Sequence, residues 1–420
     1  MRRRGLLLRL RNGERGAVST IVAVLLMGGV VMGMLALTVD VGNAWAERRQ
    51  LQNGADATAL ALASQCASGT PDCTVDAATK LTPLAGANAD DGRSDVDVCY
   101  RSAGTFALPG PACSSGDYEQ LTKCVPVPDW LTGSFPYVET VTRTRSADGT
   151  STIMPKFFSQ LLIGGPGNDV SVEACARAAW GPPTTYSGTI PFVLSACEWQ
   201  EFMDTNKDGE VDDSDIGYYA KPADGAKPGY GDPGQPAWPE PTREQVMYIF
   251  DGADATSCDY LDKDTAGGFG WVLSDTCQAT VSTDGWVQIS TGKPPANPCK
   301  PILESLRGTV VSIPVFNCLV KDPSVVPSGP IEGYTCSADG AGGAKTYYHI
   351  KGWAQFYVSG YNMPSMNENS YLTSALPCTN PSACISGWFV EGVLSGAPGG
   401  AIGSPGGSED FGSYMVVPAG

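Results

Sequence analysis

One uncharged segment constrains this chain more than any other feature of its sequence. Residues 17–39 read AVSTIVAVLLMGGVVMGMLALTV, which is 23 consecutive positions without a charged side chain. About 20 apolar residues in a helix are enough to cross the hydrocarbon core of a bilayer. The chain contains no second segment of this kind. The sequence therefore predicts one transmembrane helix, which separates a tail at 1–16 from all that follows.

The flanking charges predict the orientation of that helix. Residues 1–16 contain six arginines and a single glutamate. Short basic flanks stay on the cytoplasmic side, so we expect a cytoplasmic N-terminus and an extracytoplasmic C-terminal domain in a single-pass membrane protein. The remaining residues carry 21 basic and 43 acidic side chains. The net charge of these residues, −22, repels phosphates, so nucleic acid is not an expected partner. The lipid bilayer is an expected partner because of the transmembrane helix.

A cleaved signal peptide is the alternative to a retained anchor. The triplet Ala44-Trp45-Ala46 places small residues where signal peptidase cuts, which would release a chain beginning at Glu47. However, the apolar run is longer than the roughly 7–15 residues of a signal sequence. Asp40 also lies between the run and the cleavage site. We therefore expect the anchor to be retained.

Cysteine usage independently indicates export. All fourteen cysteines follow the membrane segment, and none forms a CxxC pair. With His349 as the single histidine, a zinc site is difficult to build. An even number of cysteines outside the membrane indicates disulfide bonds, whose connectivity the sequence does not give. The short loops favour the pairs Cys66–Cys73 and Cys378–Cys384.

The expected fold class is α+β: a transmembrane helix that continues into a stalk helix, followed by a disulfide-rich, mainly β ectodomain. Residues 40–66 lack proline and are rich in helix-favouring alanine, leucine, glutamine and arginine. Trp45 is expected at the outer membrane interface. Within the membrane, Gly29 and Gly33 have a GxxxG spacing that permits close helix approach, although glycine is common in such helices anyway.

The ectodomain is expected to consist of strands, turns and loops. Residues 67–185 are interpreted as an irregular disulfide-rich region and residues 186–396 as a β-rich region, because β-branched and aromatic runs recur there between turn residues. The expected strands are 189–196, 285–290, 308–316, 346–361 and 385–394, the fourth being either one long strand or two strands broken at Gly352. The Gly-rich residues 397–420 are expected to be a flexible tail.

Three motifs now carry a family resemblance. They are ERGAVS (14–19), ALTVDVG (36–42) and RRQLQNGADATALA (48–61). In this order, over about 50 residues, the segment resembles the N-terminal region of TadE/TadG-like Flp pilus-assembly proteins. The resemblance implies an envelope-anchored accessory component of a tight-adherence pilus system, with other Tad components as possible partners. The composition, and more weakly IPVFN (313–317) and ISGWFV (385–390), are similar to actinobacterial TadG-like proteins.

Type IV pilins similar to this class are cut after a glycine and carry a glutamate five residues into the mature chain. Here Gly16 is followed by Ala17, Val18, Ser19, Thr20 and Ile21, and Glu14 lies on the other side of the glycine. The missing glutamate favours an unprocessed anchor over a subunit that polymerises in the pilus shaft.

One motif predicts a metal site. Residues 204–215 read DTNKDGEVDDSD, which fits the twelve-residue calcium loop of EF-hands and dockerins. Gly209 at position 6 permits the sharp turn, and a helix at 197–203 is expected before the loop. Position 12 is an aspartate where an EF-hand has a bidentate glutamate, and a solvated acidic turn is the alternative reading. The expected structural Ca²⁺ ligands are Asp204, Asn206, Asp208, Glu210, Asp212 and Asp215.

No catalytic constellation stands out. A Ser-His-Asp or Cys-His mechanism would need His349, which lies in a strand-like run without a GxSxG motif. Neither a GxxxxGK[ST] phosphate loop nor a DxSxS metal-adhesion motif occurs. The sequence therefore predicts a non-enzymatic, membrane-anchored protein of Flp pilus assembly or adhesion. The alternative is a secreted or surface-displayed module that binds carbohydrate or protein and contains a structural calcium site.

Overall fold

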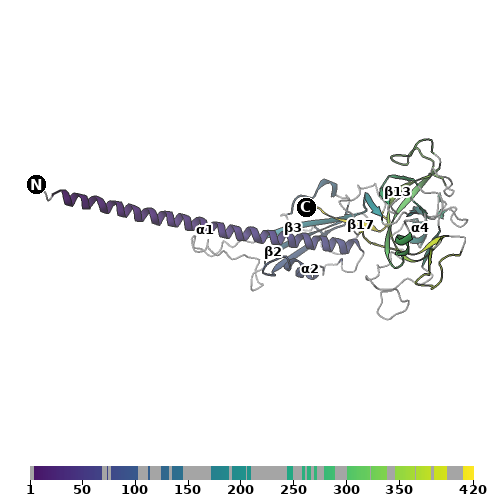
Figure 1. Ribbon diagram of the computed structural model, residues 1–420, viewed down its shortest axis with the longest axis horizontal. Coiled ribbons are helices and arrows are strands. Elements are labelled where there is room, and N and C mark those ends of the chain that lie inside the picture. The colour runs from purple at the N-terminus through teal and green to yellow at the C-terminus, as the bar shows by residue number, and fades with distance from the viewer. Residues whose placement is uncertain are drawn as a thin grey trace.

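A computed structural model shows a long helix whose C-terminal half packs on one β-rich lobe, with a second β-rich lobe beyond the end of the helix (Figure 1). The structure describes residues 4–68, 73, 77–102, 112–113, 124–131, 135–144, 172–188, 192–204, 206–209, 244–248, 258–260, 263–265, 269–271, 279–288, 300–321, 323–337, 346–364, 366–379, 383–394 and 410–420. Within these ranges, the fold is α+β, as the sequence predicts.

Helix α1 (Arg4–Ala67) is unbroken over 64 residues. At 1.5 Å per residue its length is about 96 Å. The membrane segment and the expected stalk therefore form a single rod. The predicted helix at 40–66 is confirmed, but it is not a free stalk, because its residues from Leu51 onward are buried against a sheet on one side.

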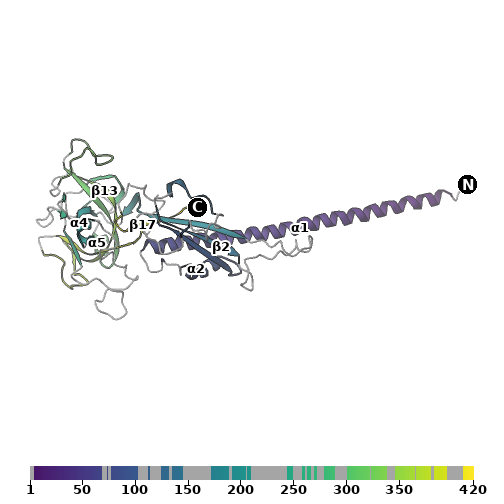
Figure 2. The ribbon, with the colours of Figure 1, turned by 180° about the vertical axis from the view of Figure 1, so that it is seen from behind.

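The membrane-proximal lobe is a five-stranded sheet that covers one side of the second half of α1 (Figure 2). The strand order is β1-β2-β3-β17-β16, antiparallel except for the parallel pair β16–β17. Helix α2 (Ala77–Gly86) packs against both α1 and β1. The strands are β1 (Ser94–Arg101), β2 (Tyr137–Thr144), β3 (Glu173–Gly181), β16 (Gly392–Val393) and β17 (Ser413–Pro418).

The distal lobe is an eight-stranded sheet at the end of the molecule away from the N-terminus (Figure 1). Its main path is β6-β15-β13-β12-β5-β9, and β11 and β14 pair with β13. Helices α4 (Ala196–Met203) and α5 (Lys300–Glu304) belong to this lobe. The strands are β5 (Phe192–Ser195), β6 (Gln245–Tyr248), β9 (Phe269–Trp271), β11 (Trp286–Gln288), β12 (Val310–Lys321), β13 (Thr346–Met363), β14 (Met366–Glu368) and β15 (Cys384–Val390).

Strand β13 organises the distal lobe. It runs unbroken through Gly352 for 18 residues, which decides in favour of one long strand. Its side chains are buried on both faces, with Tyr348, Trp353 and Phe356 among the largest fully buried groups. A strand buried on both faces lies at the centre of its lobe, and β13 pairs with four other strands.

Five disulfides join described cysteines. Both predicted short-loop pairs are present, Cys66–Cys73 and Cys378–Cys384. The others are Cys99–Cys113, Cys124–Cys175 and Cys318–Cys336. Each of the five connects residues within one lobe. Export to an oxidising compartment, expected from the cysteine count, fits this pattern.

Two boundaries expected from the sequence differ from the structure. The region 67–185, expected to be irregular, contains α2, the 3-10 turn η2 (Asp129–Leu131) and the strands β1, β2 and β3. The region 397–420, expected to be flexible, ends in β17. Both errors have one cause: these strands are flanked by Gly-rich or polar segments, and their partners lie far away in sequence. For 397–409, the expectation lies outside the described residues.

Candidate membrane anchor and its junction with the lobes

The anchor half of α1, residues 18–39, exposes its apolar side chains all round. Ile21, Leu26, Met27 and Met34 are each at least 60% exposed. The described helices include one that is long and apolar enough to cross a membrane, and its most apolar window is not buried within the protein. Since 23 residues span about 34 Å against a hydrocarbon core of about 30 Å, this half has the length of a membrane crossing.

The polar side chain near the end of this half is satisfied within the helix. The Thr38 hydroxyl donates to the carbonyls of Met34 and Leu35, at 2.8 and 2.9 Å. An unpaired hydroxyl in hydrocarbon would cost free energy, so this back-bonding suits a lipid environment.

The end of the anchor half carries an interfacial aromatic group. Trp45 is 58% exposed, and the guanidinium of Arg49 lies 3.7 Å from its ring centroid. Indole rings prefer the headgroup layer, and a cation over the ring face is attracted by its π electrons. Trp45 is six positions beyond Val39, about 9 Å along the helix, so the ring lies just outside the apolar run.

Small residues on α1 form its junction with the membrane-proximal sheet. Ala55, Ala59 and Ala63 repeat at i, i+4 spacing and are at most 1% exposed, with Leu51 and Leu62 beside them. Residues four apart share one face of a helix, and alanine brings that face close to a sheet. Opposite them lie inward-facing residues of the sheet such as Val138, Ala176 and Trp180. The alanine-rich motif of residues 48–61 is therefore a packing surface.

Three side-chain hydrogen bonds set the position of α1 on the sheet. The Thr140 hydroxyl donates to the Ala55 carbonyl at 2.9 Å, and the Thr142 hydroxyl donates to the Leu51 carbonyl at 2.8 Å. The Gln52 amide donates to the Cys175 carbonyl at 2.9 Å. Each bond joins residues more than 80 positions apart in sequence. These contacts hold the rod rigidly against β2 and β3.

Helix α2 approaches α1 at a glycine. A Cβ at Gly54 would lie 3.2 Å from the Ala85 carbonyl oxygen, which is tighter than most contacts of this kind. The turn after α2 meets α1 closer to the membrane, where Gln50 bonds Asp90 through both its amide and its carbonyl oxygen. Glu47 lies beside this turn, and its pKa is raised by burial and then by the charges of Asp91 and Asp90.

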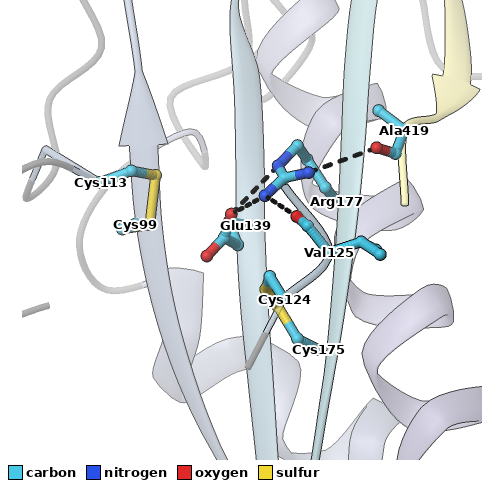
Figure 3. A network of polar contacts seen from close by, with 8 residues as sticks. All are labelled: Cys99, Cys113, Cys124, Val125, Glu139, Cys175, Arg177 and Ala419. Carbon is cyan, nitrogen blue, oxygen red and sulfur yellow. Dashed lines mark hydrogen bonds and ion pairs between the residues drawn. A yellow bond between two sulfur atoms is a disulfide. The ribbon is translucent and has the colours of Figure 1, made fainter. Parts of the chain in front are cut away.

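The face of the sheet turned away from α1 carries a buried ion pair (Figure 3). Arg177 on β3 donates to the Glu139 carboxylate on β2 through Nε and Nη2, at 3.0 and 2.6 Å. It also donates to the carbonyls of Val125 and Ala419. The Arg177 and Glu139 side chains are 2% and 9% exposed. This ion pair ties the C-terminus to the sheet beside the Cys124–Cys175 disulfide.

The predicted calcium loop is described over its first half. Helix α4 ends at Met203, as the sequence predicts, and its C-cap residue Asp204 is fully buried. Its carboxylate accepts from the amides of Asp208 at 3.2 Å and Gly209 at 2.8 Å. Gly209 has φ 99°, the left-handed conformation expected at position 6. The structure brings Asp204, Asn206 and Asp208 together, and Glu210, Asp212 and Asp215 lie outside the described residues.

The described residues contain one other group with metal-ligating atoms in reach of one another. It consists of Cys124, Glu139 and Cys175. The two cysteines form a disulfide, and Glu139 is paired with Arg177. Thiolate ligands are therefore absent from this group, and the cluster is structural.

His349 occupies a structural position in β13. It is 2% exposed, its Nδ1 lies 2.8 Å from the Asn317 Oδ1, and its ring lies 5.0 Å from that of Trp286. Its pKa is lowered, chiefly by burial. Asn317 and Trp286 are neither nucleophile nor carboxylate, so these contacts do not form a catalytic triad.

Sequence reasoning missed the residues that join the elements. Thr140, Thr142, Glu139 and Arg177 have no local motif, because their partners come from other segments of the chain. The available signal was the alternation of residues 137–144, YVETVTRT, in which every second residue faces α1. This alternation is a weak signal, because inward-facing positions such as 140 and 142 are occupied by threonine, a polar residue.

The comparisons with known proteins agree with the anchor and its junction. Residues 16–65 match the family model described as putative Flp pilus-assembly TadE/G-like. Among curated proteins and among solved structures, nothing matches this chain. The matched residues cover the membrane segment and most of the surface of α1 that contacts the sheet. Residues 16–65 are therefore similar to the TadE/G-like Flp pilus-assembly family, and most of both lobes lies outside the matched residues.

Proposed function

We propose that this protein is a non-enzymatic, single-pass membrane accessory of Flp pilus assembly. Its N-terminus is cytoplasmic, and both lobes lie outside the membrane. The observation that carries this proposal is the division of α1 into two halves. The first half exposes apolar side chains suited to lipid, and the second half is the core of a folded lobe. The lobes are thereby held at a fixed height and orientation at the membrane surface.

The continuity of α1 favours a retained anchor over a cleaved signal. The triplet Ala44-Trp45-Ala46 lies inside the helix, and Ala44 packs against the cluster of Leu51, Val172 and Ala174. A protease needs an accessible, locally unwound backbone at this triplet. Unwinding it would disturb the packing at the base of the membrane-proximal lobe.

The test combines topology with pilus assembly in a host that carries this gene. Alkaline phosphatase fused after residue 420 should be active, and the same fusion after residue 16 should be inactive. Deleting the gene should reduce Flp pili, and the full chain should restore them. A version exported through a cleavable signal without residues 1–39 should not restore them. Normal piliation in the deletion strain would contradict the pilus role, whatever the topology.

A calcium ion at residues 204–215 is a second, structural proposal. It is supported by the fit of the first half of the loop, in which the buried Asp204 carboxylate and the turn at Gly209 are arranged as the motif requires. Bound Ca²⁺ would be held by the oxygens of Asp204, Asn206 and Asp208, with the remaining predicted ligands from the second half. Its role would be to order the end of α4.

Calcium binding is tested by thermal melting of the full chain in detergent. For a dissociation constant of about 10⁻⁴–10⁻³ M, 10 mM Ca²⁺ should raise the free energy of unfolding of the distal lobe by about 1.4–2.7 kcal/mol, relative to the same protein in chelator. Asp208→Asn removes a ligand charge and should abolish most of this gain. Asp213→Asn makes the same charge change at a position that is not a predicted ligand and should preserve it. Equal melting in calcium and chelator would refute the site.

A further inference from the structure

A cavity of about 720 Å³ lies at the base of the membrane-proximal lobe. It is formed between α1 and the start of β3, and Val125 also lines it. Binding sites for small ligands have volumes of roughly 300–1,000 Å³, so this one is of adequate size. Its position is unusual, because its lining begins at Val41, two residues beyond the apolar run of the anchor half.

With the apolar run placed in the hydrocarbon core, the end of the cavity at Val41 lies at the height of the lipid headgroups. From Val39 to Arg48 the helix rises about 14 Å, and headgroups extend roughly 5–8 Å beyond each side of the hydrocarbon core. Helical side chains lean toward the N-terminal end of their helix, which for Arg48 is the direction of the membrane. An arginine there reaches its guanidinium down to the phosphate layer, with its aliphatic stem along the helix.

The lining combines an apolar wall with one cationic group. Val41, Ala44, Val172 and Ala174 supply the wall, and Arg48 supplies the charge. Arg48 and Arg49 are the only adjacent basic residues after the membrane segment, in a part of the chain that is otherwise strongly acidic. Glu173 also lines the cavity, but its carboxylate is paired with Arg143 at 3.3 Å. Arg48 is therefore the cationic group of the lining that an anion would meet.

We propose that this cavity binds one anionic phospholipid of the adjoining leaflet. The lipid phosphate would lie at Arg48, its glycerol region beside Trp45, and the start of one acyl chain along Val41 and Ala44. Because the lining begins two residues beyond the anchor half, a lipid would enter the cavity by lateral movement within the leaflet. A bound lipid would add a direct contact between the lobe and the leaflet, which an acidic ectodomain facing anionic lipids does not make by itself.

This inference rests on the membrane anchor of the proposed function, and the experiment separates the two. The full chain is reconstituted in nanodiscs of phosphatidylcholine with or without phosphatidylglycerol, then extracted into detergent. Native mass spectrometry counts the phospholipid that stays bound. The expected result is one retained phosphatidylglycerol per chain and much weaker retention of phosphatidylcholine. A chain that fails to enter nanodiscs contradicts the anchor, whereas an inserted chain that retains neither lipid contradicts only the lipid site.

Three variants localise the binding. Arg48→Gln should weaken phosphatidylglycerol retention about fivefold, the effect of one arginine at a membrane surface. Ala44→Trp fills the cavity without changing charge and should abolish retention. Arg101→Gln makes the same charge change on an exposed residue at the far end of β1 and should leave retention unchanged. If Arg48→Gln and Arg101→Gln retain the lipid equally well, the lipid site is refuted, even where Ala44→Trp melts too early to be informative.

Discussion

At the scale of single residues, the membrane-proximal lobe depends on one buried charge pair. Burying an ion pair gains little over an apolar pair of the same shape, but breaking it leaves a desolvated charge. Arg177 also satisfies two backbone carbonyls, so its removal orphans several groups at once (Figure 3). The contribution of this residue is to hold three separate segments in one place.

The first prediction concerns this pair. Arg177→Met should destabilise the lobe by about 3–5 kcal/mol, because the Glu139 carboxylate is left buried and unpaired. Arg143→Met breaks the ion pairs of Arg143 with Asp97 and Glu173, whose side chains are partly exposed. It should lower the free energy of unfolding by about 1 kcal/mol or less. Thermal melting of both variants in the same detergent measures the difference. Equal losses would show that the Arg177 pair is no more important than a surface pair.

The second prediction concerns His349. Burial lowers its pKa below the usual 6.5, an effect that outweighs the opposing charges of Asp284 and Glu332; Lys351 lowers it further. The unfolded chain then binds a proton more readily than the folded one, so stability is full above about pH 6.5 and falls as the pH drops below it.

His349→Gln removes this titration and should flatten the dependence of the melting temperature on pH between about 7 and 5. The two proteins are compared over that range, where most carboxylates do not titrate. Parallel pH profiles for both proteins would mean that other groups cause the slope.

At the scale of elements, β17 corrects the largest error of sequence reasoning. This strand pairs with β3 on one side and β16 on the other, and it buries Tyr414 and Met415. Its last residues add main-chain bonds, because Arg177 exchanges hydrogen bonds with Ala419 and Gly420. The C-terminus thus completes the sheet that packs on α1, as its position beside the rod shows (Figure 1).

The third prediction follows from that position. Deleting residues 410–420 should expose the edge of β3 and remove three large buried side chains, Phe411, Tyr414 and Met415, each worth about 1.5–3 kcal/mol. The truncated protein should become sensitive to protease within residues 84–144 and tend to aggregate. Pro418→Ala changes an exposed residue at the end of β17. It should change the free energy of unfolding by no more than about 0.5 kcal/mol relative to the parent protein. Protease resistance of the truncated protein would mean that β17 is dispensable.

At the scale of the whole molecule, the two lobes are joined by more than one connection. The chain passes from β15 into β16 and so from the distal lobe into the membrane-proximal sheet. Phe411, directly before β17, contacts Trp199 of α4 edge-on, with ring centroids 4.8 Å apart. Calcium at the end of α4 would therefore act close to the contact between the lobes.

The fourth prediction tests whether the lobes need the membrane segment. The window of highest hydropathy in α1 packs against no other described part of the protein. Residues 40–420, exported to an oxidising compartment through a cleavable signal, should therefore be soluble and melt cooperatively within a few degrees of the full chain. Circular dichroism and size-exclusion chromatography provide the measurements. An aggregated or unfolded product would show that the anchor half stabilises the lobes.

Features encoded in consecutive residues can be read from the sequence alone. The uncharged run at 17–39, the helix-favouring residues 40–66 and the recurring aromatic runs of β12, β13 and β15 were all recognisable, because each is encoded in consecutive residues. Two disulfides were predictable from short loops, and the start of the calcium loop from the spacing of its oxygens.

Which of these elements contact one another becomes visible only in the folded protein. The stalk is a packing surface because Thr140 and Thr142, some 85–90 positions away, bond its carbonyls. The C-terminal segment forms strand β17 because it pairs with β3, which lies more than 200 residues earlier in the sequence. The cavity exists because β3 starts beside α1 near Ala44. Such pairings depend on long-range burial and hydrogen bonding, which no local window of sequence records.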